Sequence, residues 1–250
     1  MKKSIAFVQQ NSTNSIYSDG KKFWSVSCDS AAKGFEKLGY KVLGFSSQAE
    51  LPQILSRETP VRGSVQTFRQ VLKHLGVNPP PNVDIPEELM GFAGRRVWTS
   101  TVGEVLSRKE TVFVKPLLFQ KDFPGHIAYN GRTIRRLNLP NNYPILCQDV
   151  TDFHSGELRV YVIEGKIVGK YFSDLFTWTL SSRENSMLKT MLATYKSQPA
   201  GFCLDVARKK NDNKLVLIEV NEGFSCGNYG LPHKVYAEMI EARWRELVSK

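Results

Sequence analysis

The sequence predicts an α+β fold in which a small N-terminal α/β unit precedes a larger α+β body. Three observations carry this prediction: a strand–helix–strand pattern within about the first 45 residues, short strands and hairpins from residue 143 onward, and a helix from about residue 233. A strand–helix–strand run is typical of parallel strands joined by a crossover helix, whereas hairpins pair antiparallel strands. We therefore expect a parallel sheet first, followed by hairpins.

The N-terminal unit is predicted from its apolar spacing. Residues 4–9 indicate a first strand rather than a signal peptide, because they lack a long apolar core and a small-residue cleavage site. Residues 27–38 indicate an amphipathic helix that Gly39 ends, and residues 40–45 indicate a second strand. The helix is recognised by four apolar side chains at helical spacing: Ala31, Ala32, Phe35 and Leu38. The unit has no GxGxxG sequence, so we do not expect a dinucleotide site there.

The middle of the chain begins with a further helix and a rigid connector. Residues 65–75 form the predicted helix, which Gly76 ends, and residues 78–86 (NPPPNVDIP) form the connector. Residues 95–101 and 111–116 are predicted strands.

Composition narrows the classes of function. The net charge of +10 favours anionic ligands such as nucleotides, acidic peptides or nucleic acid, although excess lysine can also simply solubilise a surface. No run approaches the roughly 18 to 20 apolar residues of a membrane span. Four cysteines lie far apart, without metal-binding spacing, which indicates a reduced, cytoplasmic compartment: Cys28, Cys147, Cys203 and Cys226.

Residues 201–223 indicate a hairpin whose turn lies in KKNDNK. If the loop has three residues, with Asn213 in the left-handed conformation, Asp205 lies opposite Glu219 and Asn221 shares their face. Two facing carboxylates repel each other unless a cation lies between them, and Mg²⁺ prefers such oxygen ligands. A two-residue loop would instead place Asp205 on the other face. The alternative to a metal site is that Asp205 is an edge residue and that Glu219 and Asn221 cap the turn.

Residues 157–172 (ELRVYVIEGKIVGKYF) indicate a second hairpin, with a two-residue turn at residues 164–165. Counting from this turn places Arg159 opposite Lys170. Two facing cations are unfavourable unless an anion such as phosphate lies between them. The alternative is a solvated outer face that carries spare charge.

Lys115 ends an apolar strand, VFVKP, and the loop that follows contains Lys121 and Gly125. A lysine in this position can bury its stem and direct its ammonium at a phosphate, and the loop can fold over phosphates. The loop has far fewer glycines than a P-loop, and a lysine that snorkels to the surface would give the same pattern.

Five segments in this order resemble the ATP-grasp superfamily: VFVKP, CQDV, ELRVYVIEGKIVG, FCLDV and LIEVNEGFSCGNYG. The resemblance covers roughly residues 65–230 and is greatest to the carboxylate–amine ligase branch, particularly to small phage and bacterial proteins. It implies an ATP-grasp fold with a pre-ATP-grasp unit over residues 1–64 and an ATP-grasp domain over residues 65–250. Within that domain it implies a lid at about 90–147 and a metal-binding part at about 148–250.

The resemblance also implies roles for individual residues. Lys115 would contact the nucleotide phosphates and the adenine side, and Arg159 would contact the γ-phosphate or acyl-phosphate oxygens. Either Arg95 or Arg96 would take the place of the usual first lysine. Gln148, Asp149 and Val150 would form an adenine hinge. Asp205, Glu219 and Asn221 would bind Mg²⁺.

The expected function is an ATP- and Mg²⁺-dependent ligase that joins a carboxylate to an amine through an acyl phosphate, on anionic small-molecule or peptide substrates. Arg159 and Lys170 would offset charge on the transferred group. We expect the substrate loops at residues 13–24, 172–182 and 225–232.

Three alternatives compete with the ligase. A phosphotransferase with a non-carboxylate acceptor keeps the same fold. A basic nucleic-acid-binding protein would use the charge and aromatic residues such as Trp178, but no recognition motif supports it. A hydrolase with a GxSxG elbow at residues 223–227 lacks a later aspartate, and His233 precedes Glu238 against the required order.

Overall fold

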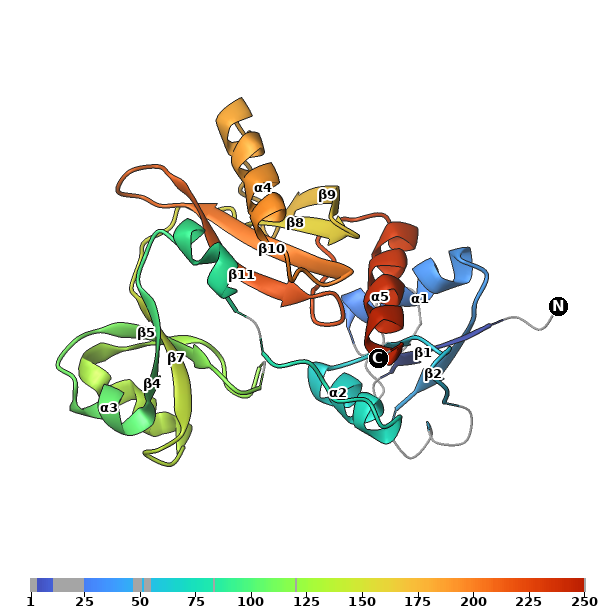
Figure 1. Cartoon of the computed structure of the whole chain (residues 1–250), viewed down its shortest axis with the longest axis horizontal. Coiled ribbons are helices and arrows are strands. Elements are labelled where there is room, and N and C mark those ends of the chain that lie inside the picture. Colours follow the sequence, from blue (N-terminus) through green and yellow to red (C-terminus); the bar gives the residue numbers. More distant parts are fainter. Residues whose placement is uncertain are drawn as a thin grey trace.

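The computed structural model describes residues 4–10, 25–46, 51, 55–82, 84–119 and 121–249. Over these residues the chain forms three sheets, one parallel and two antiparallel, with helices packed against them (Figure 1). The predicted α+β class is confirmed. No helix in these ranges is both long and apolar enough to cross a membrane.

The N-terminal unit is a parallel sheet in the order β2-β1-β3 with two helices. Its elements are β1 (Ile5–Gln9), α1 (Val26–Lys37), β2 (Lys41–Phe45), β3 (Val61–Arg62) and α2 (Val65–His74). The side chains of Ser25 and Ser64 cap the two helices by accepting backbone N–H bonds. The strand–helix–strand prediction and the helix over 65–75 are confirmed, whereas the short β3 was not predicted.

The second sheet, here called the lid sheet, is antiparallel in the order β4-β7-β5-β6. It comprises β4 (Val97–Thr101), β5 (Val112–Pro116), β6 (His126–Ala128) and β7 (Pro144–Asp149), with α3 (Val102–Ser107) and the 3₁₀ helix η3 (Tyr129–Leu137). Val105, Ile134 and Ile145 are fully buried in a core of its own. The lid sheet therefore lies apart from the rest, at the lower left of Figure 1.

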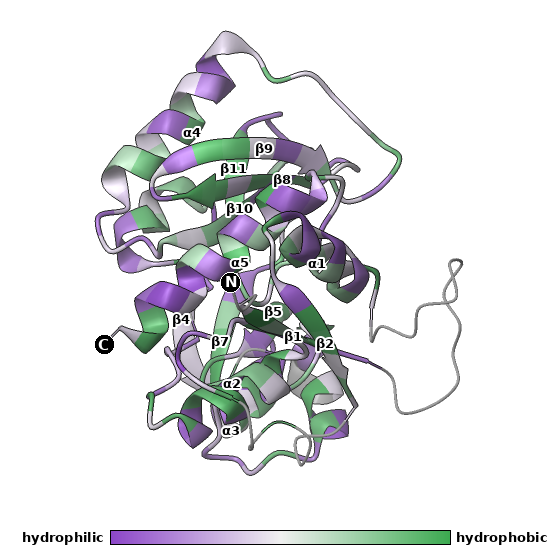
Figure 2. Ribbon diagram, turned by 90° about the vertical axis from the view of Figure 1, so that its right-hand side faces the viewer, coloured by the Kyte–Doolittle hydropathy of each residue, from purple (hydrophilic) through white to green (hydrophobic). Residues whose placement is uncertain are grey.

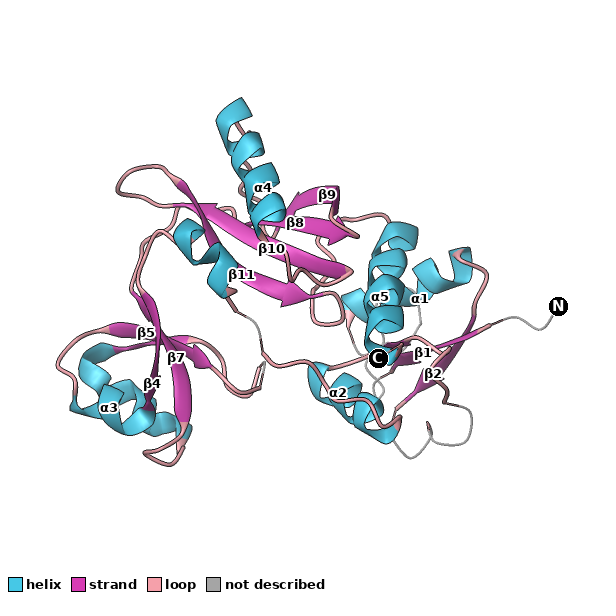
Figure 3. Ribbon diagram, viewed as in Figure 1, coloured by secondary structure: helices cyan, strands magenta, loops and turns pink. Residues whose placement is uncertain are grey.

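The third sheet, here called the central sheet, is antiparallel in the order β11-β10-β8-β9. Its strands are β8 (Leu158–Ile163), β9 (Lys166–Phe172), β10 (Gly201–Arg208) and β11 (Leu215–Glu222). A 3₁₀ helix, η2 (Glu87–Phe92), and two α-helices, α4 (Ser182–Thr194) and α5 (His233–Val248), accompany it. The same elements are distinguished as helix and strand in Figure 3.

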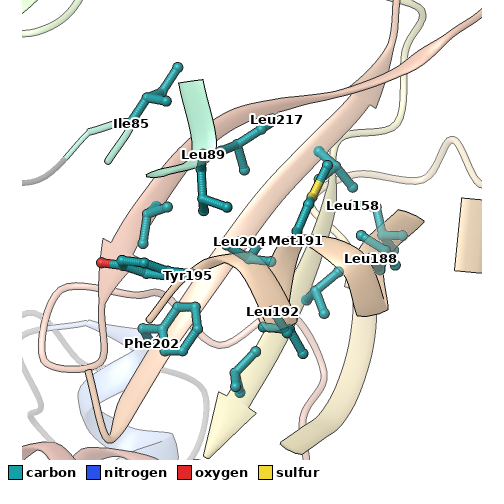
Figure 4. Close-up of a cluster of buried hydrophobic side chains, with 14 of the residues drawn as sticks. Ile85, Leu89, Leu158, Leu188, Met191, Leu192, Tyr195, Phe202, Leu204 and Leu217 are labelled. Atoms are coloured by element: carbon teal, nitrogen blue, oxygen red, sulfur yellow. The ribbon is translucent and has the colours of Figure 1, made fainter. Parts of the chain in front are cut away.

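Each face of the central sheet has its own apolar core. On one face, Leu188 and Met191 of α4 pack with Leu158 and Leu204 of the sheet (Figure 4). On the other face, α5 and α1 cover the sheet. Both α4 and α5 carry hydrophilic and hydrophobic residues along their length (Figure 2), as expected of helices that bury one side. Strand residues buried on both faces read as continuous apolar runs, which explains why β10 and β11 were recognisable.

Helix α4 was missed, since hairpins alone were expected between residue 143 and the C-terminal helix. Its start does carry a local signal. Ser181 and Glu184 form a capping box, in which each side chain accepts a hydrogen bond from the other residue's backbone. The C-terminal helix starts at His233, as predicted.

Candidate functional site

Two neighbouring cavities are lined by residues of both the lid sheet and the central sheet. The first, here called the hinge cavity, has a volume of about 400 Å³ and includes the segment between β7 and β8. Its apolar side chains are Phe113, Ile127, Val150, Phe153 and Ile218. The second, here called the loop cavity, has a volume of about 380 Å³ and is lined by the β5–β6 loop. Lys115 and Glu219 line both cavities and therefore mark their junction.

Asp205 of β10 and Glu219 of β11 are paired across the central sheet, as predicted. Asn221 follows Glu219 by two residues and lies on the same face. Asp205 is completely buried, whereas Glu219 and Asn221 line the loop cavity. The two strands thus bring together the three residues that the sequence singled out.

The β10–β11 loop that sets this register differs from the prediction. The backbone N–H of Lys209 donates to the carbonyl oxygen of Lys214 at 3.0 Å, so the loop has four residues instead of three. Such a loop alone would shift the pairing by one residue, but a β-bulge at Ile218 shifts it back. Asn213 does adopt the predicted left-handed conformation, with φ of 56°.

A network of charged groups joins these residues. Arg159 of β8 donates from Nε and Nη2 to the two carboxylate oxygens of Asp205, at 2.8 and 2.6 Å. Asn221 Nδ2 donates to Asp205 Oδ2 at 2.8 Å and to Glu219 Oε1 at 2.7 Å. Lys115 Nζ donates to Glu219 Oε2 at 2.5 Å. Each carboxylate therefore has a cation, and the amide of Asn221 bridges the two.

This network corrects the argument from charge repulsion. The sequence reasoning required a cation between Asp205 and Glu219, but Arg159 and Lys115 already neutralise them within the chain. Burial alone would raise the pKa of Glu219, yet the ammonium of Lys115 and the amide of Asn221 hold it at about 2. Glu219 is therefore ionised at neutral pH and its charge stabilises the folded chain.

The β8–β9 hairpin does not place Lys170 opposite Arg159, and this prediction is wrong. The turn at residues 164–165 forms as expected, with φ of 46° and 74°. A β-bulge at Val168 then shifts the register, so that Arg159 pairs with Tyr171 and Lys170 pairs with Val160.

The side chain of Lys170 lies away from the two carboxylates. Its Nζ donates to Asn185 Oδ1 of α4 at 2.7 Å. The guanidinium of Arg159 lies over the ring of Tyr229 instead, with 4.1 Å between its carbon and the ring centroid. Arg159 therefore has no cationic partner in β9.

Of the two candidate arginines, Arg95 lines the hinge cavity and Arg96 does not. Arg95 donates from Nε and Nη2 to Gln148 Oε1, at 2.9 and 2.8 Å, and further to the carbonyl oxygens of Leu217 and Ile218. Arg96 is exposed and pairs with Asp149 at 2.9 Å. Of the two, Arg95 is therefore the one that lies at the hinge cavity.

The predicted hinge residues Gln148, Asp149 and Val150 all line the hinge cavity. The side chain of Gln148 is buried and is hydrogen-bonded at both its amide oxygen and its amide nitrogen, while the side chain of Val150 is exposed. Lys121 is exposed, has φ of 63°, and lines the loop cavity. In the described ranges, no ion pair involves Lys121.

The predicted substrate loops are only partly described. Residues 13–24 lie outside the described residues. In the loop at residues 172–182, Leu175 and Phe176 are exposed, while Trp178 Nε1 donates to the carbonyl oxygen of Gly156. In the loop at residues 225–232, Tyr229 is partly exposed beside Arg159.

Ser225, in the GxSxG sequence, is buried, and its hydroxyl donates to the carbonyl oxygen of Glu222 at 3.0 Å. The nearby His233 contacts Ser30 instead. Ser225 and His233 therefore do not pair with each other as a nucleophile and its base would.

Two acidic residues of the site were missed in the sequence. Asp84 lines the loop cavity and Glu157 lines the hinge cavity. Burial raises the pKa of Asp84 to about 6, and burial together with the charges of Asp205 and Glu219 raises that of Glu157 to about 7. Glu157 could have been found, because it precedes Arg159 by two residues and shares its side of an extended segment. Asp84 follows a proline-rich connector and has no periodic signal.

The oxygen donors of the site determine whether it suits a divalent cation. Within the described ranges, no three His, Cys, Asp or Glu side chains gather closely enough to form a metal site. Asp205, Glu219 and Asn221 provide carboxylate and amide oxygens, which suit a hard cation such as Mg²⁺. The ammonium of Lys115 already occupies a cation position at Glu219. These residues therefore fit Mg²⁺ provided that Glu219 exchanges Lys115 for the metal ion and that Asp205, whose two oxygens both accept from Arg159, shares one of them.

A family model described as "ATP-grasp domain, R2K clade family 2" matches residues 92–239, which include the whole lid sheet and the central sheet. The chain belongs to this ATP-grasp family. No curated protein matches its sequence.

Solved ATP-grasp structures resemble the whole chain. A RimK domain protein from Sphaerobacter thermophilus DSM 20745 has 14% identity and a TM-score of 0.58, over 99% of this chain and 100% of that one. D-alanine–D-alanine ligase from Bacillus anthracis, in complex with ATP, has 13% identity and a TM-score of 0.58, over 100% and 99%. The ATP-grasp ligase PsnB, in complex with a minimal precursor, has 13% identity and a TM-score of 0.50, over 96% and 99%. At these identities the likeness shows the ATP-grasp fold alone.

Proposed function

We propose that this ATP-grasp protein is an ATP- and Mg²⁺-dependent ligase that joins a carboxylate to an amine through an acyl phosphate. The observation that carries the proposal is the junction of the two cavities. There, Lys115, Arg159, Asp205, Glu219 and Asn221 form one connected network beside an apolar cavity. The solved ligases of the same fold support the reaction class.

The hinge cavity suits the base of a nucleotide. Phe113, Phe153 and Ile218 provide an apolar surface, and residues 148–150, the proposed adenine hinge, line the same cavity. The phosphates would then extend to the junction, where Lys115 lies, and into the loop cavity, where Lys121 lies. Lys121 is suited to a phosphate, because no ion pair in the described part of the chain competes for it.

Asp205, Glu219 and Asn221 would hold Mg²⁺, with phosphate oxygens completing its coordination. When bound, Mg²⁺ neutralises phosphate charge and favours transfer of the γ-phosphoryl group. The contribution of the chain is to fix these side chains in advance. Arg159 orients Asp205 through two hydrogen bonds, and Asn221 keeps the two carboxylates at a fixed separation.

The proposed reaction has two steps. An oxygen of the substrate carboxylate attacks the γ-phosphorus, the bond to the β-phosphate oxygen breaks, and ADP leaves. The amine nitrogen then attacks the acyl carbon, loses a proton, and releases phosphate that retains one oxygen of the carboxylate. The cationic groups Lys115 and Arg159 would stabilise the negative charge on the transferred group. The net charge of +10 favours anionic substrates at this site.

Labelled oxygen tests the reaction directly. Pools of amino acids and small acids with both carboxylate oxygens isotopically heavy would be incubated with the protein, ATP and Mg²⁺, and the products analysed by mass spectrometry. The ligase proposal expects an amide product and one heavy oxygen in the released phosphate. A stable phosphorylated product would indicate a phosphotransferase. ATP-independent binding of nucleic acid, without turnover of any pool, would contradict both.

A further inference from the structure

The connector between α2 and η2 places one carboxylate at the junction of the two cavities. Asp84 Oδ1 accepts a hydrogen bond from Lys115 Nζ at 2.6 Å, and Asp84 Oδ2 accepts one from Gln148 Nε2 at 2.7 Å. The backbone carbonyl oxygen of Asp84 accepts a further bond from Val220 N at 2.6 Å. Its side chain is only 10% exposed. Asp84 is therefore held at both its side chain and its backbone.

The partners of Asp84 belong to both sheets that line the cavities. Lys115 lies on β5 and Gln148 on β7 of the lid sheet, whereas Val220 lies on β11, directly after Glu219. Gln148 in turn accepts hydrogen bonds from Arg95. A single carboxylate from the connector thus links the ammonium, the buried amide and the strand that carries the proposed Mg²⁺ ligands.

Lys115 is shared between Asp84 and Glu219, with Nζ–O distances of 2.6 and 2.5 Å. A buried ammonium without a partner is costly, so Lys115 keeps at least one carboxylate. If Glu219 turns its oxygens to a cation, Asp84 remains as the partner of Lys115. If Asp84 loses its charge, Glu219 is the one carboxylate among the described residues that can still pair with Lys115. Lys115 would then hold Glu219 away from Mg²⁺.

We propose that Asp84 is a positioning residue of the proposed site, which holds Lys115 and Gln148 in place and leaves Glu219 available to Mg²⁺. The inference rests on the proposed nucleotide binding. It differs from a purely structural role because it predicts an effect on the Mg²⁺ requirement, in addition to any effect on folding. Because Asp84 acts through Lys115, its effect on the Mg²⁺ requirement should disappear when the ammonium of Lys115 is removed.

The test measures the melting-temperature shift caused by ADP at increasing Mg²⁺ concentrations. Asp84→Asn is expected to need about tenfold more Mg²⁺ for half of the maximal shift, the factor that corresponds to one charge-assisted hydrogen bond. Asp84→Glu, which keeps the charge, should recover most of this loss. Glu87→Gln removes the same charge from an exposed position three residues away and should match the wild type.

A double variant tests whether Asp84 acts through Lys115, and Asp84→Glu, which keeps the charge, remains available if Asp84→Asn does not fold. Lys115→Met removes the ammonium, so Lys115→Met with and without Asp84→Asn should need the same Mg²⁺ concentration. A further increase caused by Asp84→Asn in that background would contradict a role through Lys115.

The remaining outcomes separate the inference from the proposed function. If the wild type responds to Mg²⁺ and ADP, but Asp84→Asn needs no more Mg²⁺ than Glu87→Gln, the positioning role fails alone. If Asp84→Asn needs less Mg²⁺, Asp84 competes with the phosphates instead of supporting the site, and the role fails as well. If the wild type shows no shift, the proposed nucleotide site and the inference both fail.

Discussion

The hairpins β8–β9 and β10–β11 lie in the same sheet, and each contains one β-bulge, but the two bulges have opposite consequences for the site. In β10–β11, the bulge at Ile218 compensates for a four-residue loop and keeps Asp205 opposite Glu219. In β8–β9, the bulge at Val168 follows an ideal two-residue turn and moves Lys170 off the face of Arg159.

The difference shows which charges the protein pairs. Where two carboxylates meet, Arg159 from the neighbouring strand β8 and Lys115 from β5 of the lid sheet neutralise them. Where two cations would have met, the bulge separates them, and Lys170 contacts Asn185 instead. Bulges often lie next to functional sites because they redirect side chains. The comparison predicts that substitutions on the Arg159 face have large effects and that those at Lys170 have small ones.

The largest effect on stability is expected for Arg159→Met. This change leaves Asp205, which is fully buried, without its ionic partner, so the free energy of unfolding should fall by about 3–5 kcal/mol. Urea denaturation at neutral pH measures it. Adding Asp205→Asn to Arg159→Met should recover part of the loss, since no uncompensated charge remains. If Arg159→Met is as stable as the wild type, the ion pair does not hold the two strands together.

A smaller effect, which depends on pH, is expected at Glu157 on the same side as Arg159. Its pKa of about 7 lies above the ordinary value of 4.5, so between these values the folded chain binds more protons than the unfolded chain. Ionised Glu157 therefore destabilises the fold, and stability should fall as pH rises through this window. Glu157→Gln should be more stable than the wild type at about pH 8, by on the order of 1–3 kcal/mol.

The pH series provides the control for Glu157. Urea denaturation from about pH 4.5 to pH 8 should show the difference between Glu157→Gln and the wild type shrinking toward zero at the acidic end. A difference that is constant across the series would show that the substitution changes packing rather than removing a titrating group.

The smallest effect is expected for Lys170→Met, because the bulge at Val168 places Lys170 off the face of Arg159. Among the described residues, the side chain of Lys170 makes one hydrogen bond, to Asn185, and no ion pair, so the free energy of unfolding should change by no more than about 0.5 kcal/mol. The melting-temperature shift caused by Mg²⁺ and ADP should equal that of the wild type. A loss of that shift would restore Lys170 to the site and contradict the pairing of Lys170 with Val160.

Much of the fold was predictable because its signals are local. The apolar spacing of residues 27–38 and the run at residues 215–220 each identified an element correctly. Helix α4 was missed, although its capping box at Ser181 and Glu184 is a local signal. The segment was instead expected to continue a series of hairpins.

The site was predictable where family motifs and strand alternation agreed. Asp205, Glu219 and Asn221 met as expected, but the loop and the bulge were both missed, and their errors cancelled. A bulge has no sequence signal as clear as that of a turn, so counting residues from a turn fails beyond it. Asp84 could not be predicted, because its role depends on where the connector crosses β5 and β11, which only the tertiary structure shows.

The most direct test of a Mg²⁺–nucleotide site at the cavity junction is calorimetric titration of ADP into the wild type and Glu219→Gln, with Mg²⁺ and with a chelator. Glu219 is ionised at neutral pH and lines both cavities, so the account predicts that Mg²⁺ strengthens ADP binding to the wild type. In Glu219→Gln, which lacks the charged ligand, ADP binding should persist while most of the gain from Mg²⁺ is lost. If Glu219→Gln keeps the full gain, or if Mg²⁺ strengthens ADP binding in neither protein, the proposed metal site is contradicted.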